Sequence, residues 1–100
     1  RARSDFEAAI AMDPRRAEPY LNMGILSFKQ GDSAQALPLF SKAIALGTDV
    51  PEIAFYGRGL ANEDLGNIKA AYADLRRAAE LRPGWADPTR ELPRYQVRRR

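Results

Sequence analysis

The sequence predicts an all-α fold of stacked antiparallel helix-turn-helix repeats, and three observations lead to this prediction. Residues 20–24 resemble residues 55–59, which lie 35 positions later and have an aromatic residue and a glycine in the same places. Small residues recur at the same offset: Gly31, Ala36 and Ala43 correspond to Gly66, Ala71 and Ala78. Going back 34 residues, Phe40 and Ile44 correspond to Phe6 and Ile10. Apolar and small residues repeated in fixed order over so long a period indicate a helical repeat array rather than one globular core.

The first two helices are expected over residues 2–12 and 17–29. Apolar residues recur at helical spacing up to Met12, and Pro14 ends the first helix. Pro19 lies in the first turn of the second helix, where its missing N–H costs no hydrogen bond. Gly31 then supplies the left-handed conformation that commonly follows a helix end.

The next two helices are expected over residues 33–46 and 51–65. Asp32 or Ser33 caps the first of them, and Pro38 lies late enough in it to bend the helix. Residues 47–51 form a break, and Pro51 opens the following helix. A fifth helix follows the turn at residues 66–67 and runs to Leu81.

Beyond Trp85 the period ends. Asp87 and Pro88 read as an N-cap followed by proline at the first helical position, so a short capping helix through Leu92 is expected. Pro93 ends it, and residues 94–100 are expected to be extended or disordered.

The pattern resembles the tetratricopeptide repeat, a unit of two helices called A and B. The matching positions are the aromatic and glycine of helix A (Tyr20 and Gly24; Phe55 and Gly59), the turn glycines, the helix B alanines, and Leu46 and Leu81. This resemblance covers residues 2–85 and implies a right-handed superhelical solenoid. Three positions depart from the family pattern: Thr48 replaces a proline, and Ser27 and Asn62 replace aromatic residues.

The resemblance divides the chain into four parts. Residues 1–16 are helix B of an incomplete leading repeat, residues 17–51 and 52–85 are two full repeats, and residues 86–100 are a capping helix and a basic tail. Asp5 occupies the helix B position that Asp74 holds in the second repeat. We therefore expect a further helix A upstream, which would make the chain the C-terminal portion of a longer array.

A comparison of the two full repeats predicts an ion pair. The second repeat has Arg58 in helix A and Asp74 in helix B, where the first has Met23 and Leu39. Because both positions change together from apolar to oppositely charged, we predict that Arg58 and Asp74 meet between the two helices of their repeat.

In this family the helix A residues line a concave groove that holds partner segments. Beside its structural stripe, the first helix A carries apolar residues at i, i+4 and i+7, and the second helix A continues them. The predicted contact surface is Leu21, Asn22, Ile25, Phe28, Ile53, Tyr56 and Leu60. Such a surface favours an apolar peptide or helix as partner. The alternative is that these residues only cover neighbouring helices.

The functional prediction is therefore a non-catalytic scaffold or adaptor that binds a protein or peptide. The family's clamp for a C-terminal carboxylate needs basic and amide groups in the groove, whereas the matching positions here are largely apolar, so that clamp is not expected. Two alternatives stay open: self-assembly through the exposed terminal helix, and an accessory domain of a larger enzyme. Trp85 is expected to pack over the last helix pair, with ligand stacking as its alternative role.

The amino-acid composition narrows the classes of function that remain open. The chain has neither cysteine nor histidine, so disulfides, thiolate chemistry and the commonest metal ligand and general base are excluded. We expect no cofactor, no metal and no enzymatic activity in these residues. No apolar run approaches the roughly 18 residues of a membrane span, and the compartment stays open between cytoplasm and periplasm. Arginine greatly outnumbers lysine, which hints at a GC-rich bacterial source.

The net charge of +3 belongs to the C-terminal end. Residues 90–100 carry a local charge of +4, which leaves −1 for the remainder. Residues 98–100 are three arginines, which are interpreted as a solubilising tail, with nucleic acid or acidic lipid as the less favoured partners.

Overall fold

The chain forms five helices in the part that the structure, a computed structural model, describes, namely residues 2–87. They are α1 (Ala2–Met12), α2 (Ala17–Lys29), α3 (Ser33–Ala45), α4 (Pro51–Asp64) and α5 (Ile68–Leu81). The predicted all-α repeat fold is confirmed. Ala86 and Asp87 are helical, and the rest of the expected capping helix and the basic tail lie outside the described residues.

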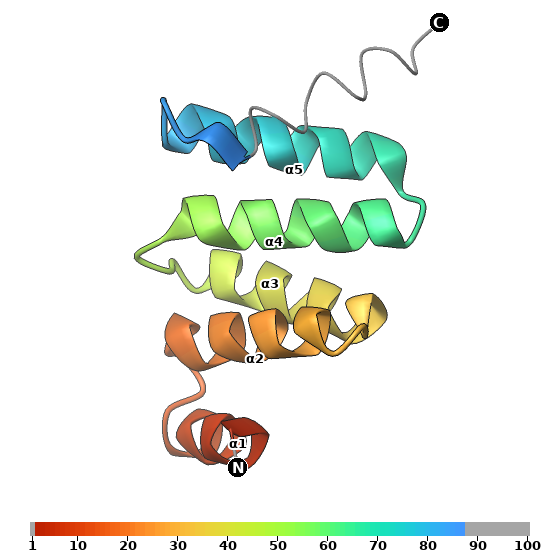
Figure 1. The fold of residues 1–100 in the computed structure, drawn as a ribbon. Helices are drawn as coiled ribbons and strands as arrows, with labels where there is room; N and C mark the ends of the chain where they lie inside the picture. The colour runs from red at the N-terminus through yellow and green to blue at the C-terminus, as the bar shows by residue number, and fades with distance from the viewer. Residues whose placement is uncertain (1, 88–100) are drawn as a thin grey trace, which may run out of the picture.

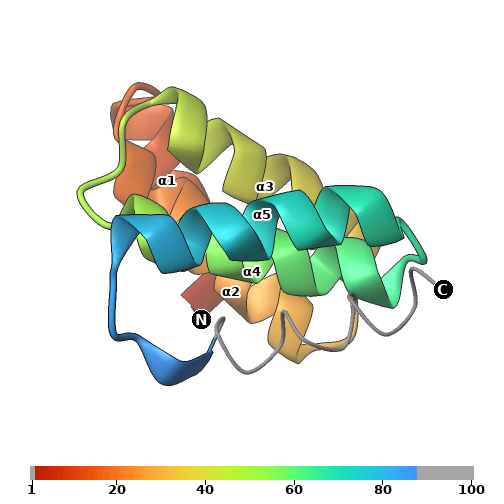
Figure 2. The ribbon, with the colours of Figure 1, turned by 90° about the horizontal axis from the view of Figure 1, so that it is seen from above.

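The helices stack in sequence order from α1 to α5, which gives an elongated molecule of 48 × 26 × 18 Å (Figure 1). The most extensive contacts are those within each repeat, α2 with α3 and α4 with α5, and α3 then packs against α4. The two A helices, α2 and α4, run in the same direction and also touch one another (Figures 1 and 2). Their adjacency creates the surface on which a partner could lie.

Each turn of the array has a local cause. Gly31 and Gly66 have φ values of +84°, a conformation that residues with a Cβ rarely adopt. Asp32 caps α3, since its carboxylate accepts a hydrogen bond from the Gln35 N–H at 3.1 Å. Thr48, at the position where the family has proline, is buried, and its hydroxyl accepts from the Val50 N–H at 3.3 Å.

The core depends on small residues that let the helices approach closely. Ala36, Ala43, Ala71 and Ala78, all in B helices, are 0% exposed. Phe40 and Leu75 fill the spaces between helices, at 1% and 0% exposed. A Cβ added to Gly24 would lie 3.0 Å from the Phe40 ring, and one added to Gly59 would lie 2.9 Å from Leu75 Cγ. The glycines of helix A therefore leave the space that the large side chains of helix B fill.

Candidate functional site

An apolar pocket lies between the two A helices. It has a volume of about 280 Å³ and is lined by Ile25, Phe28, Lys29, Phe40, Ile53, Tyr56, Gly57 and Leu60. Apart from Lys29 at its edge, the lining is made of nonpolar and aromatic side chains and one glycine. We call this feature the α2–α4 groove. Its composition suits an apolar side chain of a partner rather than a polar small molecule.

Phe40 enters this groove from α3 and forms part of its lining. A Cβ added to Gly57 would lie 2.5 Å from the Phe40 ring, closer than real atoms approach, and Gly24 meets the same ring from α2. The ring is therefore held between glycines of two successive repeats. This contact brings α2 and α4 together and sets the depth of the groove.

Five of the seven predicted contact residues line this one groove: Ile25, Phe28, Ile53, Tyr56 and Leu60. Leu21 requires a correction, because it is only 5% exposed and belongs to the core cluster with Ala36 and Phe40. The apolar stripe to which it was assigned extends into the interior, since α2 contacts α1, α3 and α4. Asn22 is exposed and does not line the groove.

The groove lining also contains Phe40, Gly57 and Lys29, which are not among the seven predicted contact residues. Phe40 was recognised only as a repeat position of helix B. Gly57 corresponds to Asn22 in the first repeat, so a comparison of repeats gave no sign that a small residue was needed there. A signal did exist in the spacing of Gly57 and Gly59, which leaves two gaps along α4 where large side chains of α3 and α5 approach.

Trp85 lies against Tyr56 at one side of the groove. The two ring centroids are 5.1 Å apart with an interplanar angle of 58°. The Trp85 ring also makes a cation–π contact with the Arg82 guanidinium, which lies 4.9 Å from the ring centroid. The chain after α5 thus returns to α4, and the indole supports a residue that faces the groove.

The groove continues into an acidic rim at the C-terminal ends of α2 and α4. A second pocket there is lined by Phe28, Leu60, Glu63 and Asp64, so it shares two residues with the apolar pocket. The carboxylate of Asp64 accepts a hydrogen bond of 2.6 Å from the Ser33 hydroxyl. This bond ties the end of α4 to the start of α3 and holds the carboxylate at the rim.

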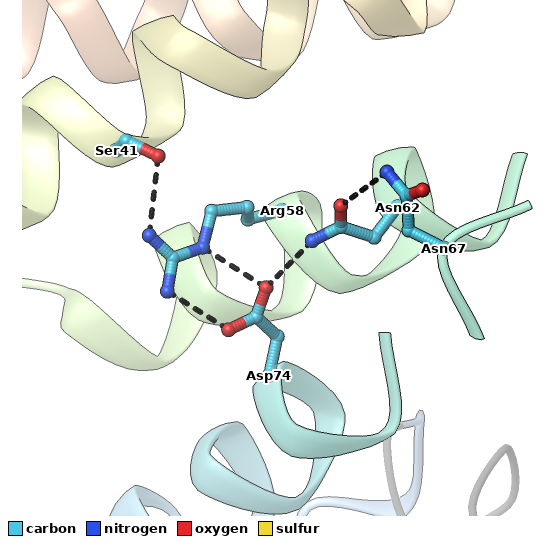
Figure 3. Close-up of polar contacts among 5 residues, drawn as sticks. All are labelled: Ser41, Arg58, Asn62, Asn67 and Asp74. Carbon is cyan, nitrogen blue, oxygen red and sulfur yellow. Dashed lines mark hydrogen bonds and ion pairs between the residues drawn. The ribbon is translucent and has the colours of Figure 1, made fainter. Parts of the chain in front are cut away.

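A polar network joins α4 and α5 of the second repeat to Ser41 of α3 (Figure 3). Arg58 donates to both oxygens of Asp74, from Nε at 2.9 Å and from Nη2 at 2.9 Å, and from Nη1 to the Ser41 hydroxyl at 3.1 Å. The Asp74 side chain is 8% exposed and that of Arg58 is 26% exposed. The structure thus brings together the two residues whose joint change was noted between the repeats.

Asn62 completes this network. Its amide donates to Asp74 at 3.0 Å, and its carbonyl oxygen accepts from Asn67 at 3.2 Å (Figure 3). The corresponding Ser27 of the first repeat is fully buried and accepts a hydrogen bond of 3.0 Å from Arg3 of α1. Both polar residues that replace family aromatics are therefore buried with hydrogen-bond partners, as buried polar groups require. All three Arg58 hydrogen bonds in Figure 3 go to side chains of the chain itself.

The comparisons with known proteins agree with this architecture. The tetratricopeptide repeat family model matches residues 1–51 and 21–86. The chain belongs to the tetratricopeptide repeat family. It is 33% identical over 78 residues to Protein FlbA of Caulobacter vibrioides, a match that covers 78% of this chain and 13% of FlbA. Members of this family act in protein–protein interaction, and the chain is a module of this general kind.

A solved structure is also similar to the chain. The crystal structure of PilW, described as a widely conserved type IV pilus biogenesis factor, superposes with a TM-score of 0.81 and 28% sequence identity. The match covers 94% of this tetratricopeptide repeat chain and 44% of PilW. The chain thus spans a small part of FlbA and less than half of PilW.

Within residues 2–87, no three acidic, histidine or cysteine side chains are grouped so that they could hold a metal ion. None of the helices in that range is long and apolar enough to cross a membrane.

Proposed function

We propose that this tetratricopeptide repeat chain is a non-catalytic scaffold or adaptor module that binds an apolar peptide or helix in the α2–α4 groove. The observation that carries the proposal is the convergence of apolar residues from two A helices on one open pocket of about 280 Å³. Each Leu- or Phe-sized side chain buried there contributes about 1.5–3 kcal/mol. Two such anchors contribute about 3–6 kcal/mol, which offsets part of an association cost of about 4–15 kcal/mol, so further contacts along the two A helices must supply the rest.

The groove also has the features of a site that needs little rearrangement when a partner binds. Phe40 is buried and held between glycines, so the floor does not need to move for a partner to enter. Tyr56 packs against the Trp85 ring, with 5.1 Å between the ring centroids. A rigid site loses less conformational entropy on binding, which favours affinity.

The test is a pull-down from bacterial lysate with identification by mass spectrometry. The parent chain is compared with an Ile25→Ser, Tyr56→Ala, Leu60→Ser variant whose helicity and unfolding transition are checked first. A triple surface change that likewise leaves the charge unaltered, Ala34→Ser, Ala70→Ser and Ala73→Ser, is the control because all three residues are exposed and line neither groove pocket. Capture that the control keeps and the groove variant loses supports the proposal, and equal capture by all three proteins contradicts it.

Self-assembly is the second candidate, and one observation favours it. Met12, at the end of α1, is 87% exposed, and α1 packs chiefly against α2. A second copy that covered α1 would bury this side chain. Sedimentation velocity over a hundredfold range of concentration tests the idea. A constant monomer mass, or an association that Met12→Ser leaves unchanged, contradicts it.

A further inference from the structure

The chain leaves the described part of the structure beside the α2–α4 groove. Trp85, which follows α5, packs on Tyr56 with 5.1 Å between the ring centroids, and Tyr56 belongs to the groove lining. Asp87 comes two residues later, so its backbone lies at most about 7 Å from that of Trp85. Residues 88–100, which lie outside the described residues, therefore start at one side of the groove. We call them the C-terminal segment.

The C-terminal segment carries apolar side chains that suit this groove. Tyr95 and Val97 are separated by one residue, so they share a face when that part of the chain is extended. Pro93 ends any helix that precedes them, which favours an extended backbone at these two positions. The side chains that form the pocket walls are half-buried and still have surface to be covered: Ile25, Phe28, Ile53 and Leu60.

The C-terminal segment is also long enough to reach every part of the pocket. From Ile53 to Leu60 the lining extends along α4 by about 10 Å, at 1.5 Å per residue. Ten residues lead from Trp85 to Tyr95, and they span up to about 33 Å when extended. If residues 88–92 form the expected short helix, the same stretch still spans about 25 Å. Length therefore does not prevent the segment from lying in the groove of its own chain.

We propose that the C-terminal segment occupies the α2–α4 groove of its own chain, with Tyr95 and Val97 in the apolar pocket, and that a partner must displace it. This inference rests on the proposed function, because the segment and the partner share that one site. Docking removes two apolar side chains and the pocket walls from water. Because the segment is tethered, its effective concentration is in the millimolar range, so a contact with a dissociation constant of about 1 mM keeps it docked about half of the time.

The docked segment should lower the affinity of the groove for any partner. The apparent affinity falls in proportion to the fraction of chains whose groove is open, so docking in half to nine tenths of the chains weakens binding about 2- to 10-fold. Replacing Tyr95 and Val97 by serine should therefore tighten the binding of a partner by the same factor. The segment acts as a weak competitor that keeps the apolar surface covered in the free chain.

A crosslinking experiment tests the docking without any partner. The chain has no cysteine, so two introduced thiols can react only with each other or with another chain. Gln96→Cys in the C-terminal segment is combined with Lys29→Cys at the edge of the groove, and disulfide formation with oxidised glutathione is followed by mass spectrometry. The control combines Gln96→Cys with Lys69→Cys, because Lys69 is exposed on α5 and lines neither groove pocket. We expect the thiol pair at the groove to close at least about tenfold faster than the control pair.

Two further variants of the crosslinking chain identify the anchors. Tyr95→Ser with Val97→Ser should slow closure at the groove to the control rate. Arg94→Ser with Arg98→Ser, which places two serines in the same segment but keeps its apolar side chains, should leave closure fast. Binding of a fluorescein-labelled amphipathic helical peptide is then measured by fluorescence anisotropy. The crosslinked chain should not bind this peptide, and reduction of the disulfide should restore binding.

The outcomes separate the docking of the segment from the proposed function. Equal closure of both thiol pairs, or equal slowing by the apolar and the arginine changes, overturns the inference and leaves groove binding intact. Disulfides that form only between chains assign the groove to a second copy, and an unchanged peptide affinity after Tyr95→Ser with Val97→Ser refutes the competition. If closure is fast at the groove but the groove variant captures the same lysate proteins as the parent, the segment covers the groove and the proposed function itself fails.

Discussion

Replacing Arg58 by methionine should destabilise the chain more than replacing Arg58 and Asp74 together. The single change removes two hydrogen bonds of 2.9 Å from a carboxylate that is 8% exposed. Of the donors that bond Asp74 in Figure 3, only the Asn62 amide remains, at 3.0 Å. Stranding a buried charge costs about 3–5 kcal/mol. Since the Arg58 side chain is 26% exposed, water can enter after its removal, and we expect about 2–4 kcal/mol.

The reciprocal change should be milder. Asp74→Leu leaves Arg58 with its Ser41 contact at 3.1 Å and with access to solvent. The Asn62 amide loses its acceptor, which costs about 1 kcal/mol. We expect about 1–2 kcal/mol in total. The double variant recreates the Met23 and Leu39 combination of the first repeat and should lose about 1–2 kcal/mol, again mostly at Asn62.

These values give a coupling energy of about 2–4 kcal/mol, to be measured by urea unfolding of the parent, both single variants and the double variant. A matched control cycle uses Arg76 and Glu80, an exposed pair at 3.3 Å with side chains 63% and 51% exposed. Its coupling should be about 0.3–0.5 kcal/mol. Additivity within about 0.5 kcal/mol for Arg58 and Asp74, or a coupling no larger than that of the control, would refute the reasoning.

Three further predictions concern packing, capping and the groove. Gly57→Ala should destabilise the chain by about 1–3 kcal/mol in urea unfolding, because the new methyl group would lie 2.5 Å from the Phe40 ring, and adding Phe40→Leu should recover part of the loss. Asp32→Ala should cost about 1 kcal/mol, since it removes the acceptor for the Gln35 N–H at 3.1 Å; a loss under about 0.3 kcal/mol would contradict the cap. Trp85, the single tryptophan, contacts a groove residue, so its fluorescence should change when a peptide binds, and an unchanged spectrum at saturation would place binding elsewhere.

The helices could be predicted from the sequence because local signals define their ends. Gly31 and Gly66 stand at turns with positive φ, and Pro51 begins α4 as expected. The α3 helix ends at Ala45, and α4 ends at Asp64, one residue earlier than the sequence suggested in each case. Differences of this size are ordinary where helices fray.

The groove could be predicted only in part, because its surface depends on how the repeats stack. Helical spacing places Leu21 on the stripe that contains Ile25 and Phe28, but it does not reveal that α1 and α3 also pack on α2. The role of Gly57 depends on a phenylalanine 17 positions earlier, in a different repeat. Such contacts between repeats leave no periodic trace when the two repeats differ at the position concerned. Side-chain spacing therefore identified the correct helices but not the complete lining.

The placement of Phe40 limits how this family member can change over evolutionary time. The same ring packs between the two repeats and lines the site where a partner is proposed to lie. A substitution that enlarged or reduced the ring would alter the angle between successive repeats together with the shape of the groove. New specificities are therefore expected to arise through the walls, at half-buried positions such as Ile25, Ile53 and Leu60, rather than at the fully buried floor. A survey of natural variants should accordingly find diverse walls over a constant aromatic floor.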